Sequence, residues 1–344
     1  MKIDFGIRLG KTLPFDEMIY QVQSAEEQGF THTNVGDLPW LNRDPHILLS
    51  VMAMHTKKIK IGQAVTYSSI YHPVVMSNIT ATLDLLSGGR MYLGLGSGMR
   101  LGKMLSPQPV SEVRKTIEFF KNYTAGEEAE WEGNKMKSGW INRKIPVYLA
   151  ADSPKMLQLA GELADGVICI GFHPEIIKWK MELVAKGALK AGRDPKSIDY
   201  WARGIVYVTD SIEQARREIT SYPALYAKIH NELQSEIPEN INLRERLNKR
   251  DPNLAEELIS DSVEVDKLWN PAWFEVIDAP FSKVVSERLI DFFHLVGTPK
   301  YIRERIDEIG ALGAKTISTW HGNVLDQEQR RKDIAEYIMP YFKS

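Results

Sequence analysis

The chain has 344 residues, of which 43% are hydrophobic and 26% are charged, and its formal net charge at pH 7 is −2. This balance is typical of a globular protein with a substantial core, and it excludes a disordered or fibrous chain. Because the near-neutral charge provides no basic field to attract nucleic acid or an anionic membrane, we expect neither partner and instead a small-molecule substrate.

The single cysteine, Cys169, cannot form a disulfide bond within the chain. It lies in the apolar segment VICI, where we expect a buried thiol and no catalytic nucleophile. The opening MKIDFGIRLG lacks a signal-peptide pattern, and no run of about 20 apolar residues predicts a membrane span. We therefore expect a cytoplasmic protein.

Short β-rich segments alternate with longer amphipathic segments, a pattern that predicts strand and helix units around a parallel sheet. In chain order, strands are predicted over residues 2–8, 31–37, 59–65, 90–96, 145–151, 165–171, 198–210 and 315–320. Helices are predicted over residues 15–28, 46–55, 73–86, 110–123, 154–163, 174–191, from 212 onward, 300–312 and 327–341. Residues 127–144 predict a loop or a hairpin. Eight predicted strands are the number that a closed (β/α)8 TIM barrel requires.

A barrel of this kind takes about 250 residues, so the remainder must be insertion. Most of it falls at about residues 231–286, after the seventh strand, and its polar first half predicts a solvated helical excursion. The second half contains Trp269, Trp273 and Phe274, which are too apolar for a free linker. We expect this part to cover a binding cleft or a subunit contact, with core packing as an open alternative. Without a repeat or an interdomain linker, residues 1–344 are predicted to form a single domain.

Two glycine clusters flank one predicted strand in LSGGRMYLGLGSGM, residues 86–99. Gly88 and Gly89 predict a left-handed end to the preceding helix. The cluster GLGSG at 94–98 lacks both the G-x-G-x-x-G spacing and the directly following helix of a dinucleotide-binding fold. At the carboxyl end of a barrel strand, glycines let a flat ring lie against the backbone, although a tight turn without a ligand explains them too.

Two segments at predicted strand ends could bind a phosphate group through the amino ends of helices. AADSPK at 150–155 and GFHP at 171–174 each place a proline at a helix start, where free N–H groups and the helix dipole favour an anion. Phosphate sites are common at the mouth of a barrel, but both segments could also be ordinary helix caps. The carboxylate of Asp152 would repel phosphate, so we expect it to cap the helix.

Three residues are candidates for proton transfer. Asp37 ends the second predicted strand, where it could bond a cofactor, take a proton, or simply form a turn before Pro39. His173 and His321 follow predicted strands, and an imidazole there could act as an acid or a base.

Other polar residues have less specific predictions. His72 is expected to cap a helix start, and Tyr67 and Tyr71 could bond a substrate oxygen or pack. No H-x-x-x-H or C-x-x-C pair predicts a metal site, and no G-x-S-x-G motif predicts a hydrolase.

Three long segments together resemble the bacterial luciferase-like superfamily of flavin and deazaflavin barrel enzymes. They are YHPVVMSNITATLDLLSGGRMYLGLGSG, IPVYLAADSPKMLQLAGELADGVICIG and LVGTPKYIRERIDEIGALGAKTIS. The second and third are most similar to the branch of methylenetetrahydromethanopterin reductase and related coenzyme F420 enzymes. The segment at about 231–286 has no counterpart in this resemblance.

The resemblance implies an oxidoreductase of the luciferase-like monooxygenase superfamily that transfers hydride with coenzyme F420 at the carboxyl ends of the strands. It also implies a non-prolyl cis peptide at the end of the third strand, here Ala64 to Val65. An Asp-His pair and a later acid are usual in the deazaflavin enzymes, whereas this chain has Leu38 and Met99 at the second and third of these positions. That departure disfavours alcohol oxidation, which needs a base.

Two alternatives stay open. The first is a two-component monooxygenase that receives reduced FMN from a separate flavin reductase, and the second is a cofactor-free binding protein. The apolar helices of the first barrel half predict a homodimer.

The predicted catalytic residues are Asp37, His173 and His321, and no metal ligand is predicted. The predicted cofactor-binding residues are Asp37, Ala64, Val65, Thr66, Gly96, Ser97, Gly98, Ala151, Asp152, Ser153, Pro154, Gly171, Phe172 and His173.

Overall fold

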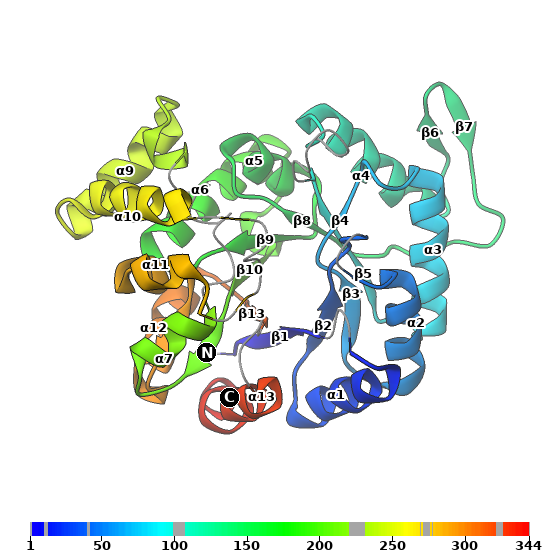
Figure 1. Cartoon of the computed structure of the whole chain (residues 1–344). Helices are drawn as coiled ribbons and strands as arrows, with labels where there is room; N and C mark the ends of the chain where they lie inside the picture. The colour runs from blue at the N-terminus through cyan, green and yellow to red at the C-terminus, as the bar shows by residue number, and fades with distance from the viewer. Residues whose placement is uncertain are drawn as a thin grey trace. The chain divides into compact units, whose positions relative to one another are not determined.

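Strands and helices alternate along the chain (Figure 1). The computed structural model describes residues 2–9, 13–39, 42–98, 107–219, 231–268, 270, 276, 278–320 and 326–343, except the side chain of Arg216. Within these ranges, none of the helices is long and apolar enough to span a membrane. The chain separates into two compact units. The N-terminal unit comprises Asp4–Cys169 and Lys180–Trp201, and the C-terminal unit comprises Met1–Ile3, Ile170–Trp179 and Ala202–Ser344.

Parallel strands form the centre of the N-terminal unit. They are β1 (Asp4–Arg8), β2 (His32–Val35), β3 (Lys60–Gln63), β4 (Thr66–Tyr67), β5 (Met91–Gly96), β8 (Val147–Ala150) and β9 (Gly166–Ile170), followed by β10 (Asp199–Gly204). Parallel pairing joins β1 to β2, β2 to β3, β3 to β5, β5 to β8 and β8 to β9. Strands β2 and β5 are buried throughout, as expected for a parallel sheet that is covered by helices.

The helices of this unit lie where the amphipathic pattern predicts them. They are α1 (Phe15–Gln28), α2 (Pro45–His55), α3 (Pro73–Leu86), α4 (Val110–Thr124), α5 (Pro154–Leu163) and the part of α6 (Pro174–Lys190) from Lys180 onward. A hairpin of β6 (Ala129–Trp131) and β7 (Asn134–Met136) occupies part of the predicted loop or hairpin. The φ angles of Gly88 and Gly89 are 68° and 88°, which confirms the left-handed turn after α3.

An aromatic layer fills the interior of the N-terminal unit. The side chains of Tyr92, Tyr148 and Trp201 pack together with Ala64 and Ile168, so four strands and the link between β3 and β4 contribute to one buried cluster. The Trp201 ring lies 5.3 Å from that of Tyr92 and 4.7 Å from that of Tyr148, centroid to centroid. Large rings from different strands thus fill the space that a barrel must fill to be stable.

The C-terminal unit also contains the second half of β10, from Ala202, and most of the predicted insertion. Its helices are α7 (Ile212–Ile219), α9 (Pro238–Arg250), α10 (Leu254–Leu268), α11 (Glu287–Phe293), α12 (Pro299–Leu312) and α13 (Gln327–Asp333). Its strands are β11 (Val206–Val208), β12 (Leu295–Gly297) and β13 (Thr316–Trp320). Helices α9 and α10 confirm the helical first half of the insertion, whereas Trp269, Trp273 and Phe274 lie outside the described residues.

Within the N-terminal unit, hydrogen bonding places the strands in the orders β3-β2-β1 and β9-β8-β5-β4, and an additional β3–β5 pairing joins these two rows. The predicted (β/α)8 barrel, with an insertion after the seventh strand, is confirmed.

Two predicted elements are divided in the structure. The strand predicted over 198–210 ends at Gly204, because the N–H of Ile205 donates to Nδ1 of His294 at 3.2 Å and β11 then pairs in parallel with β12. The helix predicted over 327–341 ends at Asp333 and continues as a π turn and a 3-10 turn, the latter around Pro340, which lacks an N–H to donate.

Candidate active site

Asp37 lies just after β2, and its side chain is fully buried. Its Oδ2 accepts a hydrogen bond of 2.7 Å from the hydroxyl of Thr66. Its Oδ1 has no partner at hydrogen-bonding geometry within the described residues. Burial raises the pKa of this carboxyl, while the bond from Thr66 and the nearby His46 and Tyr71 act to lower it. A buried carboxyl with one oxygen held and the other available can bond a ligand or exchange a proton.

The peptide bond between Ala64 and Val65 is cis, as the resemblance implies. It joins β3 to β4 and is held from both sides by the segment after β2. The N–H of Ala64 donates to the carbonyl of Val35 at 2.9 Å, and the carbonyl of Val65 accepts from the N–H of Asp37 at 3.2 Å. The segment from 64 to 66 is thereby fixed directly beside Asp37.

The second glycine cluster is explained first by packing between strands. A Cβ on Gly94 would lie 2.0 Å from the carbonyl oxygen of Gln63, and one on Gly96 would lie 3.1 Å from a methyl group of Val65. Only glycine therefore lets β5 pass so close to the end of β3. Ser97 and the left-handed Gly98 follow, both half-buried. Whether a ring lies against this strand end stays a prediction.

His46 belongs to the same region and was not predicted. It stands in the first turn of α2, where its N–H donates to the N-cap carboxylate of Asp44 at 2.9 Å. Its Nε2 lies 3.0 Å from Nε2 of Gln63, and its ring packs edge-on against Tyr71 with a centroid distance of 5.1 Å. The signal in the sequence is Asp-Pro-His, which starts a helix and sets the histidine in its first turn.

The start of α5 differs from the prediction for Asp152. Oδ1 of Asp152 accepts from Nζ of Lys180 at 2.7 Å, and the two side chains are only 11% and 2% exposed. The expected helix cap by Asp152 is therefore wrong, because the N-cap is Ser153 and its side chain makes no capping hydrogen bond. With Asp152 neutralised and Ala151 and Pro154 buried, the first amides of α5 keep their capacity for an anion.

The corresponding segment of the C-terminal unit, Gly171 to His173, is arranged differently. The N–H groups of Phe172 and His173 donate to the carbonyl of Phe292 at 3.1 and 3.2 Å, so they are already bonded within the unit. Nδ1 of His173 accepts from the N–H of Glu175 at 3.3 Å, and its ring stacks on that of Phe292. Burial lowers the pKa of the His173 imidazole to about 3. This geometry favours a structural role for His173.

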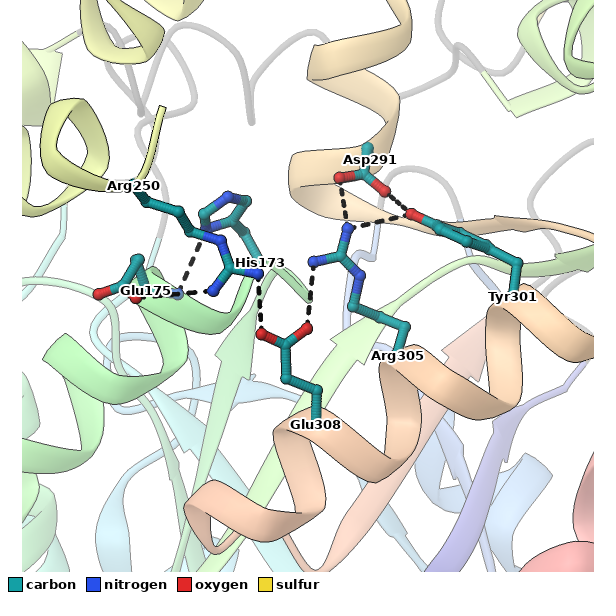
Figure 2. Close-up of polar contacts among 7 residues, drawn as sticks. All are labelled: His173, Glu175, Arg250, Asp291, Tyr301, Arg305 and Glu308. Carbon is teal, nitrogen blue, oxygen red and sulfur yellow. Dashed lines mark hydrogen bonds and ion pairs between the residues drawn. The ribbon is translucent and has the colours of Figure 1, made fainter. Parts of the chain in front are cut away.

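A ladder of ion pairs surrounds His173 in the C-terminal unit (Figure 2). Arg250, at the end of α9, lies 3.7 Å from Glu175 on α6 and 2.8 Å from Glu308 on α12. The helix from the insertion is thus tied to two neighbours, and the positive charge of Arg250 helps to keep His173 neutral.

Arg305 continues this ladder on α12. It lies 3.7 Å from Glu308 and 2.6 Å from Asp291 on α11, and it donates to the hydroxyl of Tyr301 at 3.0 Å. Tyr301 also donates to Asp291. The Arg305 side chain is 12% exposed, whereas its partners Asp291 and Glu308 are 37% and 39% exposed, so only the guanidinium is shielded from solvent.

Of the remaining predictions, two are confirmed and two concern residues that lie outside the described ranges. His72 caps α3, since its Nδ1 accepts from the N–H of Val74, and Cys169 is buried as expected. His321 and Met99 lie outside the described residues. Among the described part of the chain, no group of three or more His, Cys, Asp or Glu side chains is placed to hold a metal ion.

Comparison with known proteins decides the family. Residues 2–316 match the family model described as luciferase-like monooxygenase. The chain belongs to the luciferase-like monooxygenase family. The non-prolyl cis peptide and the strand-end carboxyl are therefore features of a family member's barrel.

Two relatives and one solved structure place the chain more closely within the family. It is 27% identical to the 5,10-methylenetetrahydromethanopterin reductase of Archaeoglobus fulgidus over 98% of this chain and 99% of that protein. It is 30% identical to the F420-dependent glucose-6-phosphate dehydrogenase of Microbacterium testaceum, over only 51% of this chain and 59% of that protein. The coenzyme F420 dependent tetrahydromethanopterin reductase from Methanopyrus kandleri superimposes with a TM-score of 0.76 at 23% identity, covering all of both chains.

Proposed function

We propose that this chain is an oxidoreductase that transfers hydride with coenzyme F420 to a small-molecule acceptor. The observation that carries the proposal is the similarity over nearly the whole length to a methylenetetrahydromethanopterin reductase. Reduction is favoured over alcohol oxidation, because similarity to the F420-dependent glucose-6-phosphate dehydrogenase covers about half of the chain.

The residues of the N-terminal unit fit a flat, anionic cofactor. Asp37 has a buried oxygen available for a hydrogen bond, and the cis peptide from Ala64 to Val65 lies beside it. Thr66 holds the carboxyl in place. When bound, F420 supplies the hydride, while the chain orients the ring and exchanges the accompanying proton at Asp37.

The start of α5 is the segment proposed to bind the phosphate of the cofactor. Its first amides are not capped by Ser153, and the ion pair between Lys180 and Asp152 removes the charge that would repel an anion. Gly171, Phe172 and His173 stay a prediction that this geometry supports less well, because two of their three N–H groups are bonded to Phe292.

The proposal is tested by titrating the purified protein with F420 and with FMN, each oxidised and reduced, and following absorbance. We expect tight binding of F420 and oxidation of reduced F420 on addition of methylenetetrahydromethanopterin, with no reaction of oxidised F420 with glucose 6-phosphate. Asp37→Asn is expected to weaken binding or turnover, and Asp16→Asn, on an exposed face of α1, serves as its control.

Other results of that titration identify the alternatives. Tight binding of reduced FMN with oxygen consumption, dependent on a separate flavin reductase, identifies the two-component monooxygenase that the family description also covers. Binding of neither cofactor at micromolar concentration identifies a cofactor-free binding protein and overturns the proposal.

We further propose that the protein forms a homodimer through α2 and α3. Large apolar side chains are exposed on these helices, with Met54 at 68%, Ile47 at 57% and Leu85 at 74%. Light scattering after gel filtration is expected to give the mass of two chains, and Met54→Glu to give that of one. The cytoplasmic location stays a prediction.

A further inference from the structure

A series of polar side chains leads from Asp37 outward within the N-terminal unit. The Asp37 side chain is fully buried, that of His46 is 14% exposed, and that of Asp44 is 49% exposed. Tyr71 is half-buried beside His46. A buried carboxyl at a site that needs proton exchange requires such a connection to solvent, because an isolated one could not lose or regain its proton quickly.

The imidazole of His46 is held from two sides. Nε2 lies 3.0 Å from the side-chain amide of Gln63, and Nδ1 lies 3.5 Å from Oδ1 of the exposed Asp44. The edge-on contact with Tyr71 fixes the plane of the ring. The Gln63 amide orients the imidazole, and the exposed Asp44 carboxylate places its other side where it can exchange protons with solvent.

Tyr71 connects this imidazole to Asp37. Its hydroxyl hydrogen-bonds to the Asp37 carboxyl. Burial raises the pKa of the Tyr71 phenol, and the nearby carboxylates of Asp37 and Asp44 raise it further. The phenol therefore stays protonated over the working range and can donate one proton while accepting another. Four groups on the surrounding elements shift the pKa of Asp37: Thr66, His46 and Tyr71 lower it, and Asp44 raises it.

We propose that His46 sets the protonation of Asp37 and, with Tyr71 and bridging water, carries its proton to and from solvent. This inference rests on the proposed hydride-transfer function. Reduced F420, if held here, would supply a hydride and a proton, and the acceptor would take up both. The Asp37 carboxylate would hold this proton until it passes to the acceptor. The Tyr71 hydroxyl, a water and the His46 imidazole would exchange the Asp37 proton with solvent near Asp44. No further oxidant or reductant is needed.

The first experiment requires no cofactor. Infrared difference spectra of the free protein against pH report the carboxyl of Asp37, which Asp37→Asn identifies. Because His46 acts to lower the pKa of Asp37, His46→Gln is expected to move the midpoint of this carboxyl signal to higher pH. His55→Gln, on the exposed last turn of the same helix, is the matched control and is expected to leave the midpoint unchanged. An unchanged midpoint in His46→Gln overturns the inference.

The second experiment uses turnover of reduced F420 with methylenetetrahydromethanopterin. His46→Gln is expected to lower kcat by about 10- to 100-fold without a matching change in KM, and His46→Ala to be restored by imidazole in the buffer. Loss of kcat without rescue by imidazole would show a merely structural role and overturn the proton route. If F420 does not bind to the unaltered protein, the proposed function fails, and the infrared result still decides whether His46 controls Asp37. Circular dichroism of each variant verifies folding.

Discussion

The carboxylate of Asp152 and the ammonium group of Lys180 lie 2.7 Å apart, and both side chains are almost entirely withdrawn from solvent. The pair joins the segment after β8 to the middle of α6, and α5 and β9 lie between them in the sequence. Two opposite charges in such a place depend on each other, because removing either one leaves the other buried without its ion-pair partner.

Lys180→Met is therefore expected to destabilise the chain by about 3–5 kcal/mol, since it leaves Asp152 charged and buried. The double variant Lys180→Met with Asp152→Asn is expected to recover much of this loss. Unfolding in urea measures both. Lys115→Met, which breaks an exposed pair with Glu112, is the control and should change little. Equal losses in the single and the double variant would contradict the interdependence.

The buried carboxyl of Asp37 makes stability depend on pH. Its folded-state pKa is raised by burial, so the folded chain favours the protonated form. The contribution is fully present below the ordinary pKa of 3.8 and is lost as pH rises through the higher folded-state value. We therefore expect Asp37→Asn to lower the free energy of unfolding least at neutral pH and most below pH 4, compared with the unaltered chain. Unfolding measured at a series of pH values tests this.

Thr66→Val provides the complementary test of the same carboxyl. The hydroxyl bond from Thr66 lowers the pKa of Asp37, so its removal is expected to raise that pKa further and to extend the pH range over which the carboxyl stays protonated. A shift of the infrared midpoint to lower pH in Thr66→Val would contradict the geometry.

The buried imidazole of His173 gives a prediction of the opposite sign. Its pKa falls from 6.5 to about 3 in the folded chain, so the unfolded chain takes up a proton first as the solution is acidified. Its contribution to stability is present above pH 6.5 and declines by up to about 1.4 kcal/mol per pH unit down toward pH 3. His173→Asn keeps an acceptor for the N–H of Glu175. It is expected to make the free energy of unfolding depend less on pH between 6.5 and 3.

The same variant tests the predicted catalytic role of His173. If the imidazole only caps α6 and packs on Phe292, kcat of His173→Asn should stay within about threefold of the original, a change of less than 1 kcal/mol in barrier height. A loss of a hundredfold or more would restore His173 to the active site.

Gly94 is expected to tolerate no side chain. Gly94→Ala would place Cβ 2.0 Å from the carbonyl oxygen of Gln63 and force β5 away from β3, at a cost of about 1–3 kcal/mol or more. Gly139→Ala is the matched control, because nothing lies within 4 Å of its Cβ. Thermal unfolding distinguishes the two, and equal melting temperatures would show that the strands adjust freely.

The barrel could be predicted because its signals are local and repeated. The helix from Phe15 to Gln28 and that from Pro73 to Leu86 have the predicted bounds, since amphipathic periodicity and proline or glycine at their ends are properties of short segments. The break after Gly204 could not be predicted, because it depends on His294, a partner 89 residues away from Ile205. Local patterns carry no information about such a bond.

The candidate site was predicted less completely for the same reason. Asp37 could be proposed from the sequence because it follows a predicted strand, and the phosphate segment because Ser153 and Pro154 begin a helix. His46 was missed because its partners Gln63 and Tyr71 come 17 and 25 positions later, brought near only by the folded chain. The ion pair of Asp152 was missed because Lys180 looks in the sequence like any other lysine of an amphipathic helix.

The pairing of β11 with β12 has a consequence for the way this protein family can diversify. Residues 206–208 pair in register with residues 295–297. The two ends of the long segment between these strands therefore lie next to each other. Such an inserted segment can become longer or shorter at little entropic cost, because the entropy lost on closing a loop increases only slowly with its length. The length of this segment can therefore vary while the pairing of β11 with β12 stays as it is.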